Sequence, residues 1–400
     1  MVDRETTNGK PERLRDAARA IAPRVVAWRR HLHANPELSF REHASARFVW
    51  EQLHDLPGVE LLEPCKTSVV ARIRRGTGGP VIALRADLDA LPIQEEGTAP
   101  YRSRVDGAMH ACGHDGHTAM LLGAAEILAG EPFEGEIRLF FQHAEETPPG
   151  GARDLIAAGL LDGVTVAVGC HLWTQLPTGR VAIVPGRMMA GNDEFTITVR
   201  GSGGHAAAPH ETVDPIAIGA EITTAINHLV ARRTSAHDSL VVSVTRFHAG
   251  NATNVIPAEA ELSGTIRYLD TAVRDATIAG IERLAAGIAD AYGATAGLEV
   301  RPGYIPVVND PVVTERVEAI ARATLGDEAV TTIPPTMGAE DFGAMLTVVP
   351  GTYMFLGTRN EAVGSHFPHH HPRFEIDEAS LEQGVVLMSA VALELLDPGP

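Results

Sequence analysis

The 400-residue sequence contains few cysteines and few lysines. Its three cysteines, Cys65, Cys112 and Cys170, are too few for the disulfide framework of a small secreted fold. Lysine occurs only at positions 10 and 66, and acidic residues outnumber basic ones 51 to 33, which gives a formal net charge of −18. Nucleic acids and anionic membranes both select for clustered positive charge, so we expect neither as a partner.

Long apolar runs and several well-known motifs are also missing. No run of about 18 apolar residues is present, so no transmembrane helix is predicted. The polar first residues, MVDRETTNGKPERLRD, do not resemble a signal peptide, and we expect a cytoplasmic protein. The absence of G-x-x-x-x-G-K-[ST] and of G-x-S-x-G argues against a phosphate-binding loop and a serine-nucleophile elbow.

Apolar strand-like runs alternate with amphipathic stretches in the first half of the chain. This alternation predicts an α/β domain with a mostly parallel sheet and helices on both faces. A helix over 12–34 is expected to be interrupted, or to begin, near Pro23. The other predicted helices are 41–53, 117–129 and 151–158, and the predicted strands are 69–74, 81–85, 136–142 and 164–170.

The pattern changes after Pro185. The order becomes strand 195–200, helix 214–232, strands 240–247 and 258–268, helix 271–292 and strand 296–301. This β-α-β-β-α-β order is typical of a ferredoxin-like α+β layer. The α/β pattern then resumes, with a helix at 312–324, a strand at 352–356 and a closing helix from 378. We therefore predict one α/β domain formed by 1–188 and 305–400, which carries an inserted α+β domain at 189–304.

Polar residues gather where the predicted strands end. Ligands of open α/β sheets bind beyond the carboxyl ends of the strands, so these groups are candidates for one site. They are Ala86-Asp87-Leu88-Asp89, His143-Ala144-Glu145-Glu146 and Cys170-His171-Leu172-Trp173, with MHACGHDGH at 109–117 and SHFPHHHP at 365–372.

Thiolate, imidazole and carboxylate groups that converge in this way are typical ligands of a divalent transition metal. Each group alone has an ordinary explanation, because a buried cysteine usually packs and a Glu-Glu pair is usually solvated. Cys112 beside a histidine could also indicate a thiol hydrolase, although the base in such enzymes usually comes from elsewhere in the chain. The convergence of five groups favours a metal hydrolase.

The chain resembles the aminoacylase and hippurate hydrolase family of metallopeptidases, in the branch of bacterial N-acyl-amino-acid amidohydrolases and plant auxin-conjugate hydrolases. The similarity extends over almost the whole chain. It is carried by RRHLHANPELSF, ALRADLDALPI, MHACGHDGHTAMLLGAA, FFQHAEETPPGGA, GCHLW, GSGGHAAAPHETVDPI, NVIPAEAELSGTIR, MGAEDF and HHPRFEIDE.

The resemblance implies two divalent metal ions per subunit, zinc or manganese, and a general base, Glu145. Of the three consecutive histidines, His370 is chosen because the family pattern places the ligand two residues before Pro372. The implied metal ligands are Cys112, which would bridge the metals, His114, Glu146, His171 and His370.

The wider family has His-x-Asp where this chain has Arg85-Ala86-Asp87. Asp87 is therefore expected to contact the ligands without being one. Asp115 and His117 are expected near the site, with capping of the following helix as the alternative role of Asp115.

The resemblance implies that 1–188 and 305–400 form the catalytic domain and that the inserted domain, 189–304, is a lid and dimerisation domain. It also implies that His205 of the inserted domain acts on the reacting carbonyl from the partner subunit of a homodimer. Without the resemblance, a histidine in this glycine-rich turn would be interpreted as structural. Asn254 and Arg267 are the candidates for binding the substrate carboxylate, and a surface ion pair is the alternative role of Arg267.

The implied activity is hydrolysis of the amide bond of N-acyl amino acids, which yields a carboxylic acid and a free amino acid. The alternatives are a dipeptidase or an N-carbamoyl-amino-acid hydrolase with the same metal site, and a small-molecule-binding protein on an inactive enzyme scaffold. The last would have no need of Glu145.

Overall fold

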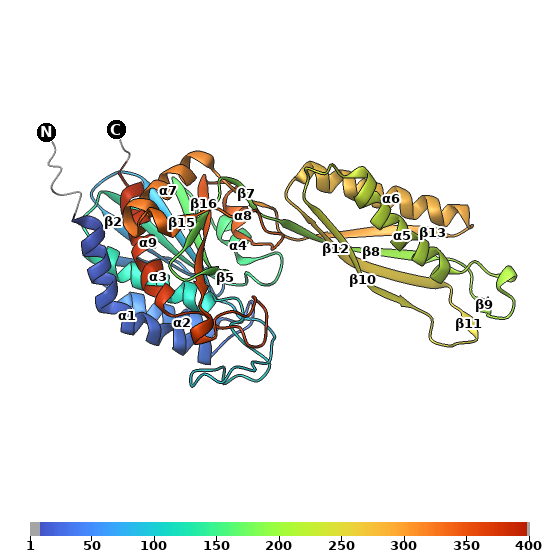
Figure 1. Ribbon diagram of the computed structural model, residues 1–400, viewed down its shortest axis with the longest axis horizontal. Helices are drawn as coiled ribbons and strands as arrows, with labels where there is room; N and C mark the ends of the chain where they lie inside the picture. The colour runs from blue at the N-terminus through green and yellow to red at the C-terminus, as the bar shows by residue number, and fades with distance from the viewer. Residues whose placement is uncertain (1–8, 398–400) are drawn as a thin grey trace. The chain divides into compact units, whose positions relative to one another are not determined.

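The computed structural model describes residues 9–397 (Figure 1). The chain forms two compact units. Within the described residues, the first comprises 9–186, 308–334 and 341–397, and the second comprises 187–307 and 335–340. The segment 335–340, expected with the catalytic part, groups with the inserted residues. Strands β7 (Gly186–Met189) and β14 (Val307–Asn309) lie where the chain passes between the units.

The first unit is built on one large mixed sheet with the strand order β1-β2-β4-β3-β5-β16-β6-β15. Its centre is parallel, because β3 pairs in parallel with β4 and β5, and β5 pairs in parallel with β16. Antiparallel pairs are found toward its edges. The strands are β1 (Val59–Leu61), β2 (Val69–Arg75), β3 (Val81–Asp87), β4 (Gly135–Gln142), β5 (Val166–Pro177), β6 (Val181–Ile183), β15 (Val330–Thr331) and β16 (Gly351–Arg359).

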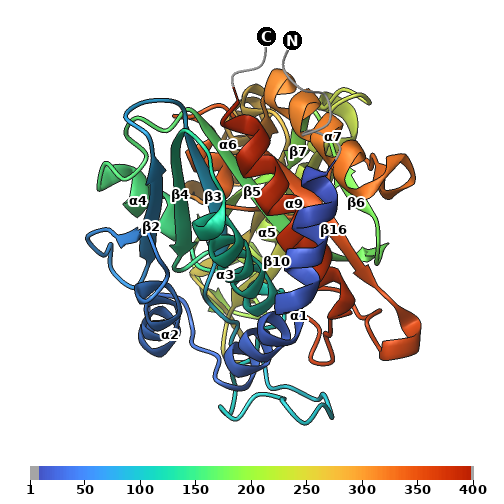
Figure 2. The same cartoon turned by 90° about the vertical axis from the view of Figure 1, so that its left-hand side faces the viewer.

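Helices cover both faces of this sheet, as predicted. Helices α1, α3 and α9 pack side by side on one face (Figure 2), where they bury apolar residues such as Val25, Leu121 and Val385. On the opposite face, Phe342 of α8 contacts Tyr353 of β16. The helices are α1 (Lys10–Ala34), α2 (His43–His54), α3 (His114–Gly130), α4 (Gly151–Ala157), α7 (Pro311–Leu325), α8 (Phe342–Met345) and α9 (Ala379–Leu395).

Several predicted boundaries were wrong, and the clearest corrections concern α1, α3 and β5. Helix α1 is continuous through Pro23, since buried residues on both sides of the proline hold it against the core. Helix α3 begins at His114 instead of 117, because Gly113 adopts φ +97°, a conformation that favours glycine. Strand β5 extends to Pro177, so His171 lies within the strand and not after it.

The second unit has the predicted β-α-β-β-α-β order. Its antiparallel sheet has the order β10-β12-β8-β13, and α5 and α6 pack against it and each other. The two helices cover an apolar core that includes Phe195, Ile222 and Ile281. The elements are β8 (Gly191–Arg200), α5 (Pro215–Arg233), β10 (Leu240–Ala249), β12 (Glu259–Tyr268), α6 (Thr271–Ala291) and β13 (Thr295–Pro302), with a small ribbon of β9 (Gly204–His205) and β11 (Val255–Ile256).

Within residues 9–397, no helix combines the length and apolar character needed to cross a membrane.

Candidate metal centre

The structure brings together all five predicted ligands in the first unit. Cys112, His114 and His171 offer ligand atoms within 4.8 Å of one another, as do Cys112, Glu146 and His370. These residues come from the turn before α3, the first turn of α3, the segment after β4, strand β5 and the segment before α9. Segments far apart in sequence thus meet near the carboxyl ends of parallel strands.

Hydrogen bonds orient two of these histidines. His114 Nδ1 lies 2.9 Å from the Asp89 carbonyl oxygen, and His171 Nδ1 lies 2.6 Å from the Leu172 carbonyl oxygen. A carbonyl oxygen accepts only, so Nδ1 carries a proton in each ring and Nε2 is the nitrogen that can bind a metal. His171 Nε2 then faces Cys112 Sγ at 3.5 Å. This is the usual arrangement of a histidine prepared to bind a metal.

Two buried polar atoms at this place lack a hydrogen-bond partner. His114 Nε2 and Glu146 Oε1 are both inaccessible to solvent and unsatisfied, and they lie 3.7 Å apart. Buried polar groups are nearly always hydrogen-bonded, so two unsatisfied atoms beside a thiol and further imidazoles need an explanation. A divalent cation fits this set of groups.

The geometry distinguishes between the neighbouring histidines of the C-terminal motif. His370 Nε2 lies 3.4 Å from Glu146 Oε1, and His370 adopts φ +65°, an uncommon conformation for a non-glycine residue. His369 instead donates from Nε2 to the Leu172 carbonyl oxygen at 2.9 Å and stacks on Trp173. His370 is therefore the one directed at the cluster, in agreement with its choice from the sequence.

Asp87 lies beside the cluster with both oxygens engaged. Its Oδ2 accepts from Arg85 at 2.7 Å, and its Oδ1 accepts from His117 Nδ1 at 2.6 Å. His117 Nε2 in turn accepts the Leu172 backbone N–H at 2.8 Å. His117 thus connects Asp87 to β5, with neither ring nitrogen left for a metal. Arg85, whose side chain is 2 % exposed, fills the position of the family's histidine and neutralises Asp87.

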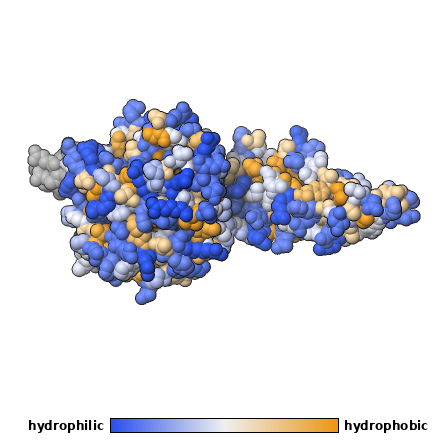
Figure 3. Space-filling model, turned by 90° about the horizontal axis from the view of Figure 1, so that it is seen from below, coloured by the Kyte–Doolittle hydropathy of each residue, from blue (hydrophilic) through white to orange (hydrophobic). Residues whose placement is uncertain are grey.

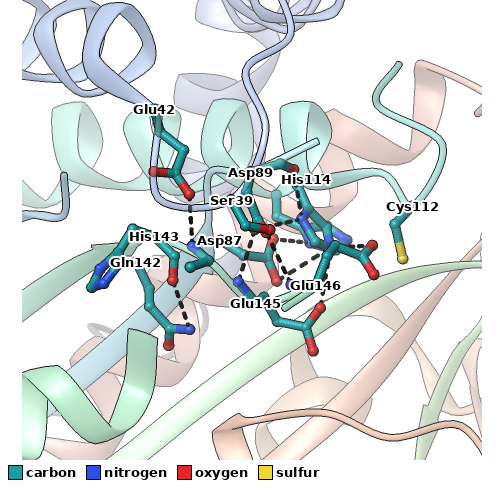
Figure 4. A network of polar contacts seen from close by, with 12 residues as sticks. Ser39, Glu42, Asp87, Asp89, Cys112, His114, Gln142, His143, Glu145 and Glu146 are labelled. Atoms are coloured by element: carbon teal, nitrogen blue, oxygen red, sulfur yellow. Dashed lines mark hydrogen bonds and ion pairs between the residues drawn. The ribbon is translucent and has the colours of Figure 1, made fainter. Parts of the chain in front are cut away.

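Asp89 has a central role that the sequence did not reveal (Figure 4). Its carboxylate accepts the backbone N–H groups of Glu145 at 3.0 Å and Glu146 at 2.9 Å, and the Ser39 hydroxyl at 2.7 Å. The same residue's carbonyl orients His114. The Asp89 side chain therefore fixes the backbone of the proposed base and of one proposed ligand, Glu146, and its main-chain carbonyl orients the ring of a second ligand, His114. Glu42, two residues after the end of the first motif, holds the neighbouring backbone, since it accepts the Ala144 N–H at 2.8 Å.

Asp115 neither binds the cluster nor caps α3, so its proposed capping role was wrong. Its Oδ2 accepts from Arg29 at 2.8 Å and lies 2.8 Å from His33 Nδ1, and all three side chains are fully buried. Arg29 also contacts Glu375 at 2.7 Å. The first turn of α3 and the segment that follows His370 are thereby both tied to α1.

The carboxylates give the cluster a strongly negative character. Burial raises the pKa of the Cys112 thiol, and Glu146, Glu145 and Asp87 raise it further. Burial lowers the pKa of His114, but Asp87, Asp89 and Glu146 outweigh this effect and raise it to about 10. Without a cation the cluster thus retains protons, and a bound cation reverses this preference because its charge stabilises thiolate and neutral imidazole.

The second unit holds the other predicted site residues at separate places. His205 and Asn254 lie together on the β9–β11 ribbon, where the Asn254 carbonyl accepts the Ala206 N–H at 3.1 Å. Arg267 lies near the far end of β12, roughly 25 Å away for eight residues of extended strand. Among the described residues, Arg267 forms no ion pair within 4.0 Å. Glu194, on the adjacent strand β8, pairs with Arg301 instead.

Comparisons with known proteins identify the family of the chain. Residues 83–394 match the peptidase family M20/M25/M40. An N-acyl-L-amino acid amidohydrolase of Geobacillus stearothermophilus is 51 % identical over 287 residues, which are 71 % of this chain and 78 % of the relative. Thermostable carboxypeptidase 2 of Saccharolobus solfataricus is 41 % identical over 96 % of this chain and 98 % of its own.

A solved structure is also similar over most of its length. A Bacillus subtilis protein, described as a dinuclear metal binding peptidase from the M20 family, superposes with a TM-score of 0.84 at 35 % identity. The match covers 95 % of this chain and 99 % of that one. The resemblance inferred from the sequence is confirmed, and the chain belongs to the peptidase family M20/M25/M40.

Proposed function

We propose that this protein hydrolyses the amide bond of N-acyl amino acids, producing a carboxylic acid and a free amino acid. The observation that carries the proposal is the pair of unsatisfied buried atoms, His114 Nε2 and Glu146 Oε1, beside the Cys112 thiol. The amidohydrolase relative supports the choice of substrate.

The chain's own residues divide the work. Cys112, His114, Glu146, His171 and His370 would hold two divalent cations. When bound, such cations lower the pKa of water and polarise a carbonyl. Glu145, 5 % exposed, has its backbone held by Asp89 and a carboxylate oxygen 3.9 Å from His114 Nε2. Glu145 would accept a proton from the attacking water and pass it to the departing amine nitrogen.

The identity of the cations is proposed from the ligand types. A thiolate and three imidazoles favour zinc, whereas the carboxylate admits manganese. We also propose a cytoplasmic location, as expected from the sequence. None of the three cysteines forms a disulfide in the structure, which is usual for proteins of reducing compartments.

A peptidase activity is the second candidate, because a carboxypeptidase is similar over nearly the whole chain. A carboxypeptidase and an aminoacylase cleave the same bond, the amide whose nitrogen belongs to an amino acid with a free carboxylate. The two activities differ in the acyl group alone. An N-carbamoyl substrate would present a urea carbonyl on the same amino acid nitrogen.

We further propose that the inserted domain, near 189–304, is a lid and forms a homodimer. Figure 3 shows apolar side chains on the surface of the second unit, and Val241 and Phe247 of the edge strand β10 are each 40 % exposed. An exposed strand edge with apolar side chains is a template for pairing with a second copy.

A dimer would also explain the separation of the residues that the family resemblance assigns to substrate. His205 and Asn254 lie at the opposite end of β12 from Arg267. A site that uses all three therefore needs two chains, with Arg267 from one and His205 and Asn254 from the other. His205 would act on the reacting carbonyl, and Asn254 and Arg267 on the substrate carboxylate.

A substrate panel tests the proposed function. Metal-free protein is reloaded with zinc or manganese and assayed on N-acetyl and N-benzoyl amino acids, dipeptides and N-carbamoyl amino acids. We expect the highest kcat/KM on an N-acyl amino acid. Highest activity on dipeptides would favour the peptidase, and retention of acyl amino acids without turnover under any metal would indicate a binding protein.

A further inference from the structure

A cavity of about 440 Å³ in the first unit adjoins the candidate metal centre. It is lined by Leu38, Ser39, Arg41, Ala90, Leu91, Pro92, Glu146 and Thr147. One member of this lining, Glu146, belongs to the metal-binding cluster, where its Oε1 lies 3.4 Å from His370 Nε2. A substrate whose reacting carbonyl lies at the cluster can therefore extend a group into the cavity. Its volume is within the usual range of small-molecule sites.

The walls of the cavity combine apolar side chains with one arginine. Leu38, Leu91 and Pro92 offer apolar surface, and Arg41 supplies the only cationic side chain in the lining. Among the described residues, the Arg41 guanidinium has neither an ion pair nor a hydrogen bond, and it is exposed. Arg29, twelve residues earlier, instead has all its contacts inside the protein. A guanidinium without a partner at the edge of an apolar cavity suits an anionic group of a ligand.

The turn that presents Arg41 is held in a strained conformation. Phe40 adopts φ +65°, which is unfavourable for a residue with a bulky side chain. The Arg41 N–H closes the turn on the Leu38 carbonyl oxygen at 2.9 Å, and Glu42 accepts the Phe40 N–H at 2.9 Å. The Phe40 ring is fixed between His143 and Lys66.

The same turn is connected directly to the metal centre. Ser39 donates to Asp89, and Asp89 holds the Glu146 N–H at 2.9 Å (Figure 4). The neighbouring Leu38 pairs with Ala90 in a parallel bridge. The cavity walls therefore have a defined position relative to Glu146, as a specificity pocket requires.

We propose that this cavity is a substrate pocket in which Arg41 binds a carboxylate while Leu38, Leu91 and Pro92 contact the adjoining apolar part of the substrate. The inference rests on the proposed function. The carboxylate has two possible sources, the α-carboxylate of the amino acid or a terminal carboxylate on a dicarboxylic acyl group. In the second case, Arg267 is left to bind the α-carboxylate.

The test compares three amides in the metal-loaded protein and its Arg41→Gln variant. The amides are N-acetyl-leucine, its analogue N-acetyl-isopentylamine, which lacks the carboxylate, and N-succinyl-leucine. If Arg41 binds the α-carboxylate, Arg41→Gln lowers kcat/KM roughly 10- to 100-fold for both leucine derivatives but not for the analogue. If it binds an acyl carboxylate, only the succinyl compound is affected. In either case Arg41→Lys recovers part of the loss.

Arg47→Gln is the matched control, since Arg47 is an exposed arginine on α2 that does not line the cavity. An Arg41→Gln variant that behaves like Arg47→Gln on all three amides overturns the proposal. An equal loss on all three, including the analogue without a carboxylate, also overturns it, because Arg41 would then act on the site as a whole.

A binding measurement separates this proposal from the proposed function. Calorimetry with N-acetyl-leucine and N-succinyl-leucine on metal-loaded Glu145→Gln protein needs no turnover. Affinity that falls 10-fold or more with Arg41→Gln supports the pocket even if the wild-type protein hydrolyses none of the amides. Unchanged affinity for both compounds contradicts the pocket even if hydrolysis is observed.

Discussion

The proposed site residues of the two units differ in how they are held. In the first unit, His114 is 1 % exposed and His171 is 4 % exposed, and each has one ring nitrogen fixed by a carbonyl oxygen. In the second unit, His205 and Asn254 are exposed, and Arg267 lies at the other end of β12. The first set is organised within one chain before any ligand binds. On our proposal, the second set would form a site only together with a second chain.

This difference shows which side chains a single chain already positions for binding. Folding has already removed water from buried polar groups with fixed partners and has already restricted their rotamers. Ligand binding therefore does not incur these free-energy costs again, and the arrangement of the groups is informative about chemistry. Exposed residues on a β ribbon still incur these costs. Variants of the residues in each set therefore test this difference.

Glu145→Gln gives the largest expected effect, in the first unit. The amide cannot accept a proton, so turnover should fall at least 10²- to 10⁴-fold, whereas both metals stay bound because Glu145 is not a proposed ligand. Metal analysis and kcat on the same preparation measure this. Glu63→Gln, an exposed glutamate, serves as the control. Full activity of Glu145→Gln would remove Glu145 from the mechanism.

His205→Ala is the corresponding test in the second unit. A preorganised donor to the reacting oxygen contributes roughly 10²- to 10³-fold to kcat, so we expect a loss of that size with unchanged metal content. His210→Ala, a change at an exposed histidine of the same segment, should have little effect.

Mixing the inactive proteins tests whether His205 acts across a dimer. Heterodimers of Glu145→Ala and His205→Ala subunits contain one site in which both residues are intact, and activity should return when the two are unfolded and refolded together. If subunit exchange is demonstrated and no activity returns, His205 serves its own chain or the fold alone.

Asp89→Asn should have an intermediate effect, on metal affinity. The substitution keeps the size of the side chain but removes an acceptor from the Glu145 and Glu146 backbone N–H groups. Loss of a group that orients ligands typically costs 10- to 100-fold in metal affinity. Competition with a chelator measures it, with Asp106→Asn as the exposed control. Wild-type affinity would mean that the Glu145–Glu146 backbone holds its position without Asp89.

The pH dependence of stability should show the smallest effect. Burial and Arg29 lower the pKa of His33, but Asp115 and Glu95 outweigh them and raise it to about 9. Protonated His33 therefore stabilises the fold fully below about pH 6.5, its unfolded pKa, and this contribution is lost as pH rises through about 9. Denaturant unfolding of wild type and His33→Gln at pH 6 and pH 9.5 should give a smaller pH difference for the variant. Equal differences would show that His33 is not protonated in the folded protein.

The fold and the metal cluster were accessible from the sequence for a physical reason. Parallel strands deliver their carboxyl ends to one edge, so the polar groups at 143–146 and 170–173 were expected to converge, whereas the individual ligands came from the family resemblance. The choice of His370 over His369 came from the family pattern, and the geometry agrees with it.

The supporting contacts were not accessible in this way. Asp89 acts through backbone N–H groups 56 and 57 residues away, and Arg29 meets Asp115 across 86 residues. No local periodicity encodes such pairs, because they depend on how helices and loops pack. The continuity of α1 through Pro23 has the same origin, since tertiary packing outweighed a local preference.

The most direct test of the proposed two-metal site is a stoichiometric metal titration of the metal-free protein, with hydrolysis of the best N-acyl amino acid followed in parallel. We predict that two zinc or manganese ions bind per chain, that bound metal protects Cys112 from alkylation, and that turnover requires the metal-loaded protein. Full turnover by metal-free protein, or equal alkylation of Cys112 with and without metal, would contradict this prediction.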